Sequence, residues 1–283
     1  MTKVLNILTI DVEDWFHICA LDNGNDKIEN WHKYKTRVID NTDKVLRILK
    51  GNNTKATFFF LGWIVEQYPQ LVMRVKEEGH EIATHGYAHK LVYKQTPAEF
   101  FEDLKKSIEI IEGIAKIKVL GNRSAGFSIT EKTPWAFDMI AKAGLQYDST
   151  VFPASRGHGG FVGAAKNIHI IKTKLGNLTE IPIPVINVMG REIAFSGGGY
   201  LRLFPYWFIK NSIAQLNKQG TPVVVYVHPR DFDLHQPRMK MPLGRRFKSY
   251  INISTTENKF KALLCDFDFV PIKEVIGIEG KNL

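Results

Sequence analysis

Short apolar runs rich in β-branched and aromatic residues alternate along this chain with longer segments in which apolar residues recur at a helical spacing. The runs that predict strands are 4–10, 56–62, 81–84, 118–123, 145–148, 180–186 and 222–228. The segments that predict helices are 41–50, 66–78, 97–115, 132–143 and 204–218. Strands that alternate with helices indicate an α/β fold, with a mainly parallel sheet or barrel and helices outside it.

The start of the helix at 97–115 is the clearest, because Thr96 can cap it, Pro97 suits its first turn and Glu99 completes a capping box. The segments 149–179 and 187–203 are richer in Gly, Ser and Arg and lack a helical period. They predict long loops that face a substrate.

The length of 283 residues suits one large α/β domain. We expect a single domain over 1–283, with its core at about 4–230 and a C-terminal extension over 231–283. That extension contains a predicted helix at 255–265 and a strand-like run at 267–272.

Polar residues stand at the ends of the predicted strands. They are Asp11 and Glu13 after the first strand, His85 and His89 after the third, Arg123 after the fourth, Asp148 at the fifth and His228 at the seventh. In a β/α barrel these ends share one face, where catalytic groups converge. The shared placement is stronger evidence for a site than any one of these residues alone.

His85 and His89 are four residues apart, and two imidazoles one helical turn apart can bind one divalent cation. Such pairs are also often solvated or structural. The third ligand has candidates in Asp11, Glu13 and Asp14, which lie between an apolar strand and an aromatic run that begins at Trp15. Helix capping is the alternative for an acidic cluster, but a capping cluster rarely occupies that position.

The chain resembles the polysaccharide deacetylases of carbohydrate esterase family four, the NodB-homology enzymes, and especially the subgroup linked to exopolysaccharide and O-antigen gene clusters. The motifs that carry the resemblance are Thr9-Ile-Asp-Val-Glu-Asp-Trp-Phe-His17, His85-Gly-Tyr-Ala-His89, Arg123-Ser-Ala-Gly-Phe-Ser-Ile129, Tyr147-Asp-Ser-Thr-Val-Phe-Pro153, Gly197-Gly-Gly-Tyr-Leu-Arg202 and Tyr226-Val-His-Pro-Arg-Asp-Phe-Asp233. They span most of the chain. The resemblance implies a distorted (β/α) barrel of about seven parallel strands, with its active site at their C-terminal ends.

The resemblance also implies roles. A divalent metal, most often zinc in this family, would be bound by His85, His89 and Glu13, with Asp14 as the alternative carboxylate. The implied catalytic residues are Asp11 as general base, Arg123 as its ion-pair partner, His228 as general acid and Asp148 as a residue that orients His228 or caps a loop. The implied substrate-binding residues are Gly126 and Phe127 through a backbone N–H, and Trp15, Tyr200, Arg202 and Arg230.

Some residues depart from the family pattern. Ala125 replaces a usual proline, and Asp148 lacks the tryptophan that normally accompanies it. Arg230 replaces a tryptophan that is common in relatives, which suits a phosphorylated or acidic substrate. Trp15 and Tyr200 are alternatively core aromatics, and His17 and His158 are the remaining histidines most able to join the site.

The formal charge of +9 suggests a polyanionic partner or simply a solvated basic surface. We expect no nucleic-acid partner, because no reader motif is present. A sugar phosphate or lipid-linked sugar at the inner membrane face would place Arg245, Arg246 and Lys248 near anionic lipid.

No apolar stretch reaches the roughly 18 residues of a membrane span, and no leader precedes the first strand. Cys19 and Cys265 imply no disulfide framework. These features predict a cytoplasmic protein, with peripheral contact at the inner membrane face as an option.

The expected function is metal-dependent removal of an acetyl group, most often an N-acetyl group, from a sugar in surface polysaccharide biosynthesis. Two alternatives stay open. One is a carbohydrate-binding or regulatory protein that has lost turnover on the same fold, and the other is an amidohydrolase that acts on a non-sugar amide. The sequence leaves the sugar, its carrier, the metal and the oligomeric state undetermined.

Overall fold

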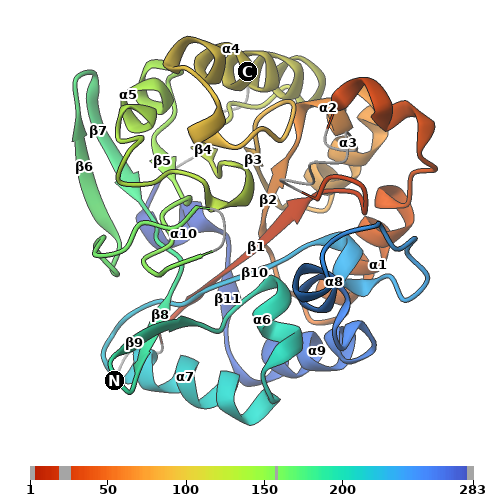
Figure 1. The fold of residues 1–283 in the computed structure, drawn as a ribbon, viewed down its shortest axis with the longest axis vertical. Coiled ribbons are helices and arrows are strands. Elements are labelled where there is room, and N and C mark those ends of the chain that lie inside the picture. The colour runs from red at the N-terminus through yellow and green to blue at the C-terminus, as the bar shows by residue number, and fades with distance from the viewer. Residues whose placement is uncertain (1–3, 19–26, 157–158, 279–283) are drawn as a thin grey trace.

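A computed structural model describes residues 4–18, 27–156 and 159–278. Its central sheet contains parallel strands in the spatial order β10-β1-β2-β3-β4-β5-β7, with β6 antiparallel at the edge and β11 paired in parallel with the first residues of β1. The strands of the sheet are β1 (Asn6–Val12), β2 (Thr57–Phe60), β3 (Glu81–Thr84), β4 (Gly121–Asn122), β5 (Tyr147–Asp148), β6 (His169–Thr173), β7 (Gly176–Glu180), β10 (Val224–Val227) and β11 (Phe269–Val270). Figure 1 shows β1 near the centre of the molecule.

Helices surround this sheet (Figure 1). They are α1 (Val38–Gly51), α2 (Gly62–Gln67), α3 (Pro69–Glu77), α4 (Pro97–Ala115), α5 (Trp135–Lys142), α6 (Gly198–Leu203), α7 (Tyr206–Lys218), α8 (Leu243–Tyr250), α9 (Thr256–Asp266) and α10 (Ile272–Ile276). The predicted capping box at the start of α4 is confirmed, since the Thr96 and Glu99 side chains each bond to the other residue's backbone N–H. No described helix is long and apolar enough to cross a membrane.

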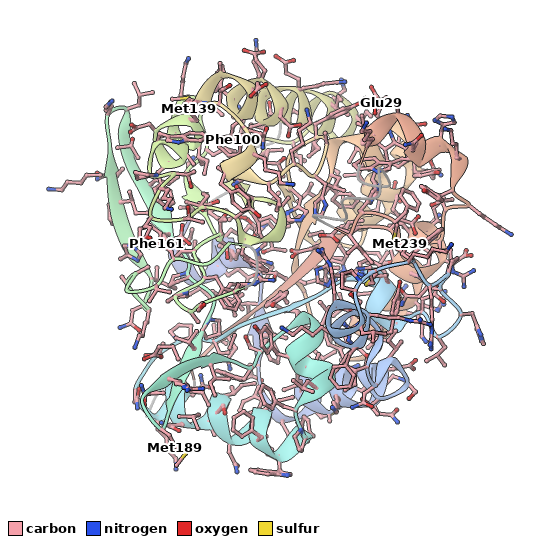
Figure 2. The ribbon with its side chains drawn as sticks, in the orientation of Figure 1. Glu29, Phe100, Met139, Phe161, Met189 and Met239 are labelled. Atoms are coloured by element: carbon pink, nitrogen blue, oxygen red, sulfur yellow. The ribbon has the colours of Figure 1, made fainter. Side chains whose placement is uncertain are left out.

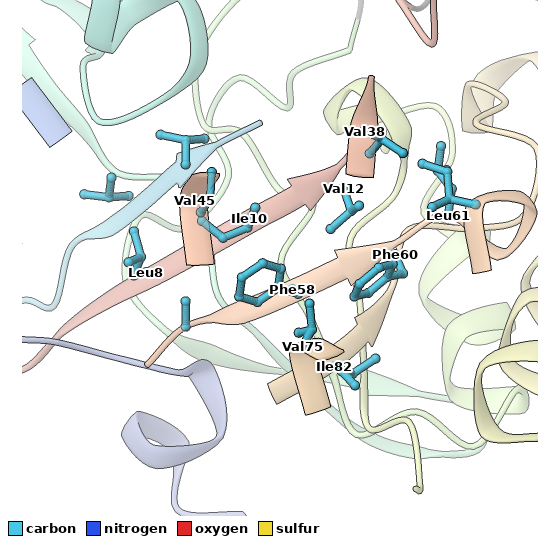
Figure 3. Packing of buried hydrophobic residues seen from close by; sticks show 14 of the residues in the cluster. Leu8, Ile10, Val12, Val38, Val45, Phe58, Phe60, Leu61, Val75 and Ile82 are labelled. Atoms are coloured by element: carbon cyan, nitrogen blue, oxygen red, sulfur yellow. The ribbon is translucent and has the colours of Figure 1, made fainter. Parts of the chain in front are cut away.

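The α/β prediction is confirmed, and the two faces of the sheet have separate cores. Alternate residues of a strand point to opposite faces. On β1, Leu8, Ile10 and Val12 pack with the helices, as Figure 3 shows. Ile7 instead joins an inner cluster with residues such as Phe59 from the other strands. Thr9, Asp11 and Glu13 share the parity of Ile7, which predicts that they face the interior of the curved sheet.

The barrel is distorted because its hydrogen-bonded ladder stays open among the described residues, between β10 and the edge strand β6. Beyond the sheet ladder, a single bridge joins Gly197 to Tyr226 on β10. Inner-face side chains from opposite sides of the sheet, such as Ile183 and Val224, still share one core. The sheet therefore curls round its interior without regular pairing across the gap.

Two segments predicted as loops contain regular structure. The segment 149–179 holds β6 and nearly all of β7, so the predicted strand at 180–186 begins too late. The segment 187–203 contributes to a second hairpin of β8 (Val185–Val188) and β9 (Arg191–Ala194), and also holds α6. Met189 lies at the hairpin turn and is almost fully exposed at the edge of the molecule (Figure 2). The strands in these two segments are short and partly polar, so the sequence pattern resembled that of a loop.

The C-terminal segment also differs from the predicted extension. Its β11 adds to the central sheet, Phe260 packs in the outer core, and Ile272 packs in the inner core. These contacts make residues 256–276 part of the main fold. Cys265 is an exposed free thiol, while Cys19 and His158 lie outside the described residues.

Candidate active site

Three potential metal ligands lie together at the carboxyl ends of β1 and β3. The Oε1 atom of Glu13 lies 3.1 Å from Nε2 of His85 and 2.9 Å from Nε2 of His89, and all three residues are buried. Glu13 follows β1 directly and His85 follows β3, so the parallel strands bring both to one edge. Within the described part of the chain, their ligand atoms are close enough to hold one ion.

His85 and His89 reach the Glu13 carboxylate from a loop, not from a helix. No helix occurs between β3 and the short 3₁₀ turn Val92–Lys94, and His89 has a left-handed backbone with a φ of 51°. The expected helical turn is therefore wrong, although both imidazoles reach the same carboxylate. The Asp103 carboxylate of α4 stabilises this loop by accepting the two backbone N–H groups that follow Gly86, at 2.7 and 3.1 Å.

The hydrogen bonds of His85 indicate how this cluster could hold a cation. Its Nδ1 lies 2.5 Å from the carbonyl oxygen of Arg123, which can only accept, so Nδ1 carries a proton. The Nε2 atom of a neutral His85 then directs a lone pair at the Glu13 carboxylate, and two acceptors at that distance need a cation or a proton between them. Two imidazole nitrogens and one carboxylate oxygen are a donor set that suits zinc.

Glu13 is also set electrostatically for this role. Burial by itself raises the pKa of its carboxyl, but the charges of His89 and His228 and the close approach of the His85 and His89 Nε2 atoms lower the pKa well below its usual range. Glu13 is therefore expected to be ionised at neutral pH.

Asp11 and Arg123 form a fully buried ion pair on the inner face of the sheet. Nη1 of Arg123 donates to Oδ1 of Asp11 at 2.8 Å and to the Thr9 hydroxyl at 2.7 Å. Nε and Nη2 donate to the carbonyl and hydroxyl oxygens of Ser149 at 3.0 and 2.9 Å, and the guanidinium carbon lies 4.3 Å from the Phe59 ring centre. The guanidinium is held at several points, and it stabilises negative charge on Asp11.

His228 lies on the opposite side of these carboxylates, after β10. Its Nε2 atom is 3.9 Å from both Oδ2 of Asp11 and Oε1 of Glu13. Nδ1 lies 2.9 Å from Oδ2 of Asp231, which also accepts the backbone N–H of His228 at 3.0 Å. The other Asp231 oxygen accepts from Nη1 of Arg202 at 2.6 Å. Asp231 thus fixes the ring, with its Nε2 directed toward the site.

Asp231 was missed by the sequence reasoning, although its position three residues after His228 in His-Pro-Arg-Asp is a signal that could have found it. The prediction that Arg202 binds substrate is wrong. Arg202 is only 2% exposed, and its guanidinium bonds to Asp231 and to the Lys248 carbonyl. Arg202 therefore holds Asp231 in place, and Asp231 in turn positions His228.

Asp148 has a different place from the one predicted. Its carboxylate accepts from Nδ2 of Asn122 and the Thr150 hydroxyl, both at 2.7 Å, and not from His228. Neighbouring Glu180 is also fully buried, and burial together with the charge of Asp148 raises the pKa of Glu180 well above its usual range. Asp148 therefore organises the sheet beneath the site, which corrects its assignment as a residue that orients His228.

Asp14 does not lie with the metal-ligand cluster. It accepts hydrogen bonds from the Thr36 hydroxyl at 2.7 Å and from the backbone N–H groups of Arg37 and Val38 at 2.9 and 3.2 Å. These atoms surround the start of α1, so Asp14 caps that helix. Trp15 is buried among aromatic rings, which confirms the alternative that it is a core aromatic. The prediction that it contacts a sugar is therefore wrong.

Gly126 and Phe127 both have left-handed backbones, with φ of 63° and 52°. The N–H of Phe127 already donates to the Ser124 carbonyl oxygen at 3.2 Å. Of the two backbone N–H groups predicted to bind the oxyanion, that of Gly126 is therefore the remaining candidate. The Phe127 ring is buried, and its centre lies 4.9 Å from that of Tyr226. This side chain contributes packing to the site.

Of the remaining predicted substrate contacts, Arg230 lies beside the cluster, with Nε 4.0 Å from Oε2 of Glu13. Its Nε and Nη1 atoms are buried without a hydrogen-bond partner. Tyr200 lies on α6 with its ring centre 6.3 Å from that of Phe152, and its contact with a sugar stays a prediction.

Comparison with known proteins gives these observations a family context. The sequence profile of the polysaccharide deacetylases matches residues 32–147, and that of a domain of unknown function, DUF3473, matches residues 149–277. The chain is therefore similar to polysaccharide deacetylases over residues 32–147. The deacetylase profile covers His85, His89 and Arg123, whereas Asp11 and Glu13 precede it and His228 lies in the DUF3473 match.

A peptidoglycan-N-acetylglucosamine deacetylase of Bacillus cereus is 40% identical over 74 residues, which are 26% of this chain and 27% of that relative. The match to this curated relative thus covers about a quarter of its length. A match of this length does not extend to whole-protein activity or substrate.

The fold of the deacetylase domain and its DUF3473 segment is found in solved structures. A protein from Mycobacterium smegmatis, assigned provisionally as a polysaccharide deacetylase, superposes with a TM-score of 0.63 at 19% identity, covering 96% of this chain and 88% of that one. A CE4 family pseudoenzyme from Bacillus anthracis, BA3943, gives 0.53 at 13% identity, with coverage of 97% and 66%. Because a pseudoenzyme shares the fold, the fold alone does not establish catalysis.

Proposed function

We propose that this protein is a metal-dependent carbohydrate deacetylase that removes an acetyl group, most often an N-acetyl group, from a sugar in surface polysaccharide biosynthesis. The observation that carries the proposal is the convergence of three functions at one edge of the sheet. They are a Glu13, His85 and His89 cluster, a buried Asp11 to Arg123 ion pair, and His228 within 3.9 Å of both carboxylates.

A bound divalent ion would supply Lewis acidity toward the acetyl oxygen and the attacking water. Asp11 accepts the proton of that water as general base, and Arg123 keeps its carboxylate oriented through the 2.8 Å bond. The backbone N–H of Gly126 is the candidate donor to the developing oxyanion.

His228 serves as general acid for the leaving amine. Burial by itself lowers its pKa, but the charges of Asp231 and Glu13 and the hydrogen bond to Asp231 raise the pKa above the usual value. A raised pKa favours the protonated ring, the form that an acid requires. Asp231 is a positioning residue for this step, since it touches His228 and not the reacting atoms.

The substrate assignment rests on less specific support. The curated relative named above acts on an N-acetylated sugar, and Arg230 adds a cation that suits an acidic or phosphorylated one. The surface-polysaccharide role, zinc as the metal, a lipid-linked substrate and a cytoplasmic location remain predictions from the sequence.

The test is acetate release from a panel of N-acetylated and O-acetylated sugars by metal-loaded protein, chelated protein and the Asp11→Asn variant. The proposal expects release that needs metal and that the substitution abolishes. Absence of release from every substrate, with metal binding intact, would support a carbohydrate-binding protein on this fold. Release from simple non-sugar amides alone would support the amidohydrolase alternative.

A further inference from the structure

A cavity adjoins the metal-ligand cluster and has no role in the chemistry above. It has a volume of about 550 Å³, and His89 forms part of its wall, so it opens beside the candidate reaction centre. Its other walls come from the segment after β1, the short 3₁₀ helix Ile28–Lys33 and the loop that follows His89. A group bound there would lie next to a sugar held at the metal-ligand cluster.

Buried donors without partners gather round this cavity. Nε1 of Trp31 is one, and Nε2 of His17 is another. The Nδ1 atom of His17 accepts the backbone N–H of Asp14 at 3.0 Å, so the proton of the neutral ring is on Nε2. Both residues are only 1% exposed, and both line the cavity.

Arg230 extends this set of donors. Arg230 lies beside Glu13 and not in the cavity wall, with Nε 4.0 Å from Oε2 of Glu13, and its Nε and Nη1 atoms have no hydrogen-bond partner. The His17 ring centre is 6.3 Å from that of His89. The unpartnered side-chain atoms of these residues are all N–H groups, so the missing partner is an acceptor. Buried donors left unpaired are costly, which makes an incoming acceptor favourable.

The charge of the cavity points to the same kind of ligand. Lys27, Lys90 and Lys94 line it, against one carboxylate, Glu29. Among the described residues, none of the three lysines forms an ion pair. Glu29 lies at the outer edge of the molecule in Figure 2. Lysine ammonium groups bind carboxylate and phosphate oxygens as point charges.

We propose that this cavity binds an anionic oxygen group, a carboxylate or a phosphate, carried by the saccharide beside the acetylated sugar. The proposal rests on the deacetylase function for its saccharide context. It makes the substrate an acidic saccharide, with Lys90 and Lys94 attracting the anion and Trp31 and His17 donating to it.

A binding experiment tests the cavity without relying on turnover. In protein labelled with ¹⁵N at the tryptophan indoles, the Trp31 resonance is assigned by its loss in Trp31→Phe. Titration with glucuronate and with inorganic phosphate should shift it saturably, and glucose should not. The shift should weaken about tenfold in the Lys90→Gln and Lys94→Gln double variant, which removes two charges from the site.

The matched control carries Lys172→Gln and Lys174→Gln, two exposed lysines on the β6–β7 hairpin. This control removes the same charge and should bind like the parent. A response to only one anion supports the proposal and identifies the group. No Trp31 shift with either anion, or an equal shift with glucose, overturns it.

Turnover provides a second readout. For an acetylated oligosaccharide that carries a uronate, the Lys90 and Lys94 double variant should raise KM about tenfold with kcat little changed, and a neutral analogue should be unaffected. Equal effects on both substrates contradict the proposal. Anion binding at Trp31 in a protein that releases no acetate would refute the deacetylase function and leave the anion site standing.

Discussion

Asp231 offers the sharpest test of the site, because the structure gives it a role that was one of two expected for Asp148. The Asp231→Asn substitution removes a carboxylate that accepts two hydrogen bonds from His228 and one from Arg202, all within a buried network. Asparagine must direct its amide at one of these donors. We expect lower stability and a displaced His228.

The magnitude follows from burial. Arg202 would remain buried without its counter-ion, and removal of one partner of a buried ion pair costs about 3–5 kcal/mol. Asp266→Asn is the control on an exposed ion pair. Asp266 pairs with Lys210, and the two side chains are 29% and 48% exposed, so its loss should cost only about 1 kcal/mol.

Urea unfolding followed by circular dichroism measures both stabilities without any substrate. Acetate release should fall about 100-fold or more in Asp231→Asn, the usual scale for a lost general acid, and stay near the parent rate in Asp266→Asn. Equal destabilisation by the two substitutions, within about 0.5 kcal/mol, would refute the reasoning from burial. A full rate in folded Asp231→Asn would refute its positioning role.

Other substitutions test separate parts of the structure. Glu13→Gln should weaken zinc binding by at least about 100-fold in calorimetry, whereas Asp14→Asn should leave it unchanged; equal loss in both would contradict the ligand assignment. Burial and then Lys55 lower the pKa of His80 to about 4 from 6.5, so the unfolded chain binds the proton more tightly. Its contribution to stability is present above pH 6.5 and is lost as the pH falls toward 4, by up to about 3 kcal/mol. Parallel pH curves for the parent and His80→Asn would rule this out. Gly121→Ala should destabilise the fold by about 3 kcal/mol in thermal or urea unfolding, because the added Cβ would lie 1.9 Å from the neighbouring tyrosine ring; unchanged stability would show that the ring can move.

The sequence predicted the alternation of strands and helices and the polar residues at strand ends because both are local patterns. The alternation on β1 places Asp11 and Glu13 on one face whatever the rest of the chain does. The capping box at Thr96 is equally local, since its groups lie within one turn. Such features are encoded over a few residues and need no tertiary contact.

Tertiary contacts decided what the local pattern could not. Asp14 and Glu13 are adjacent acidic residues, but only packing shows that α1 lies where Asp14 can cap it while Glu13 reaches the histidines. The sequence offered Asp148 and not Asp231 as a partner of His228, because that choice depends on distances across the sheet.

The sequence by itself therefore determined the α/β class and the residues gathered at the strand ends, through periodicity and spacing. Only the tertiary structure decided which carboxylate faces each histidine, that Arg202 is a buried support, and that unpaired donors surround a cavity beside His89. The physical reason is that hydrogen bonds and ion pairs depend on ångström-scale distances between distant segments. Those distances are fixed when the sheet curls and the helices pack, and no local pattern records them.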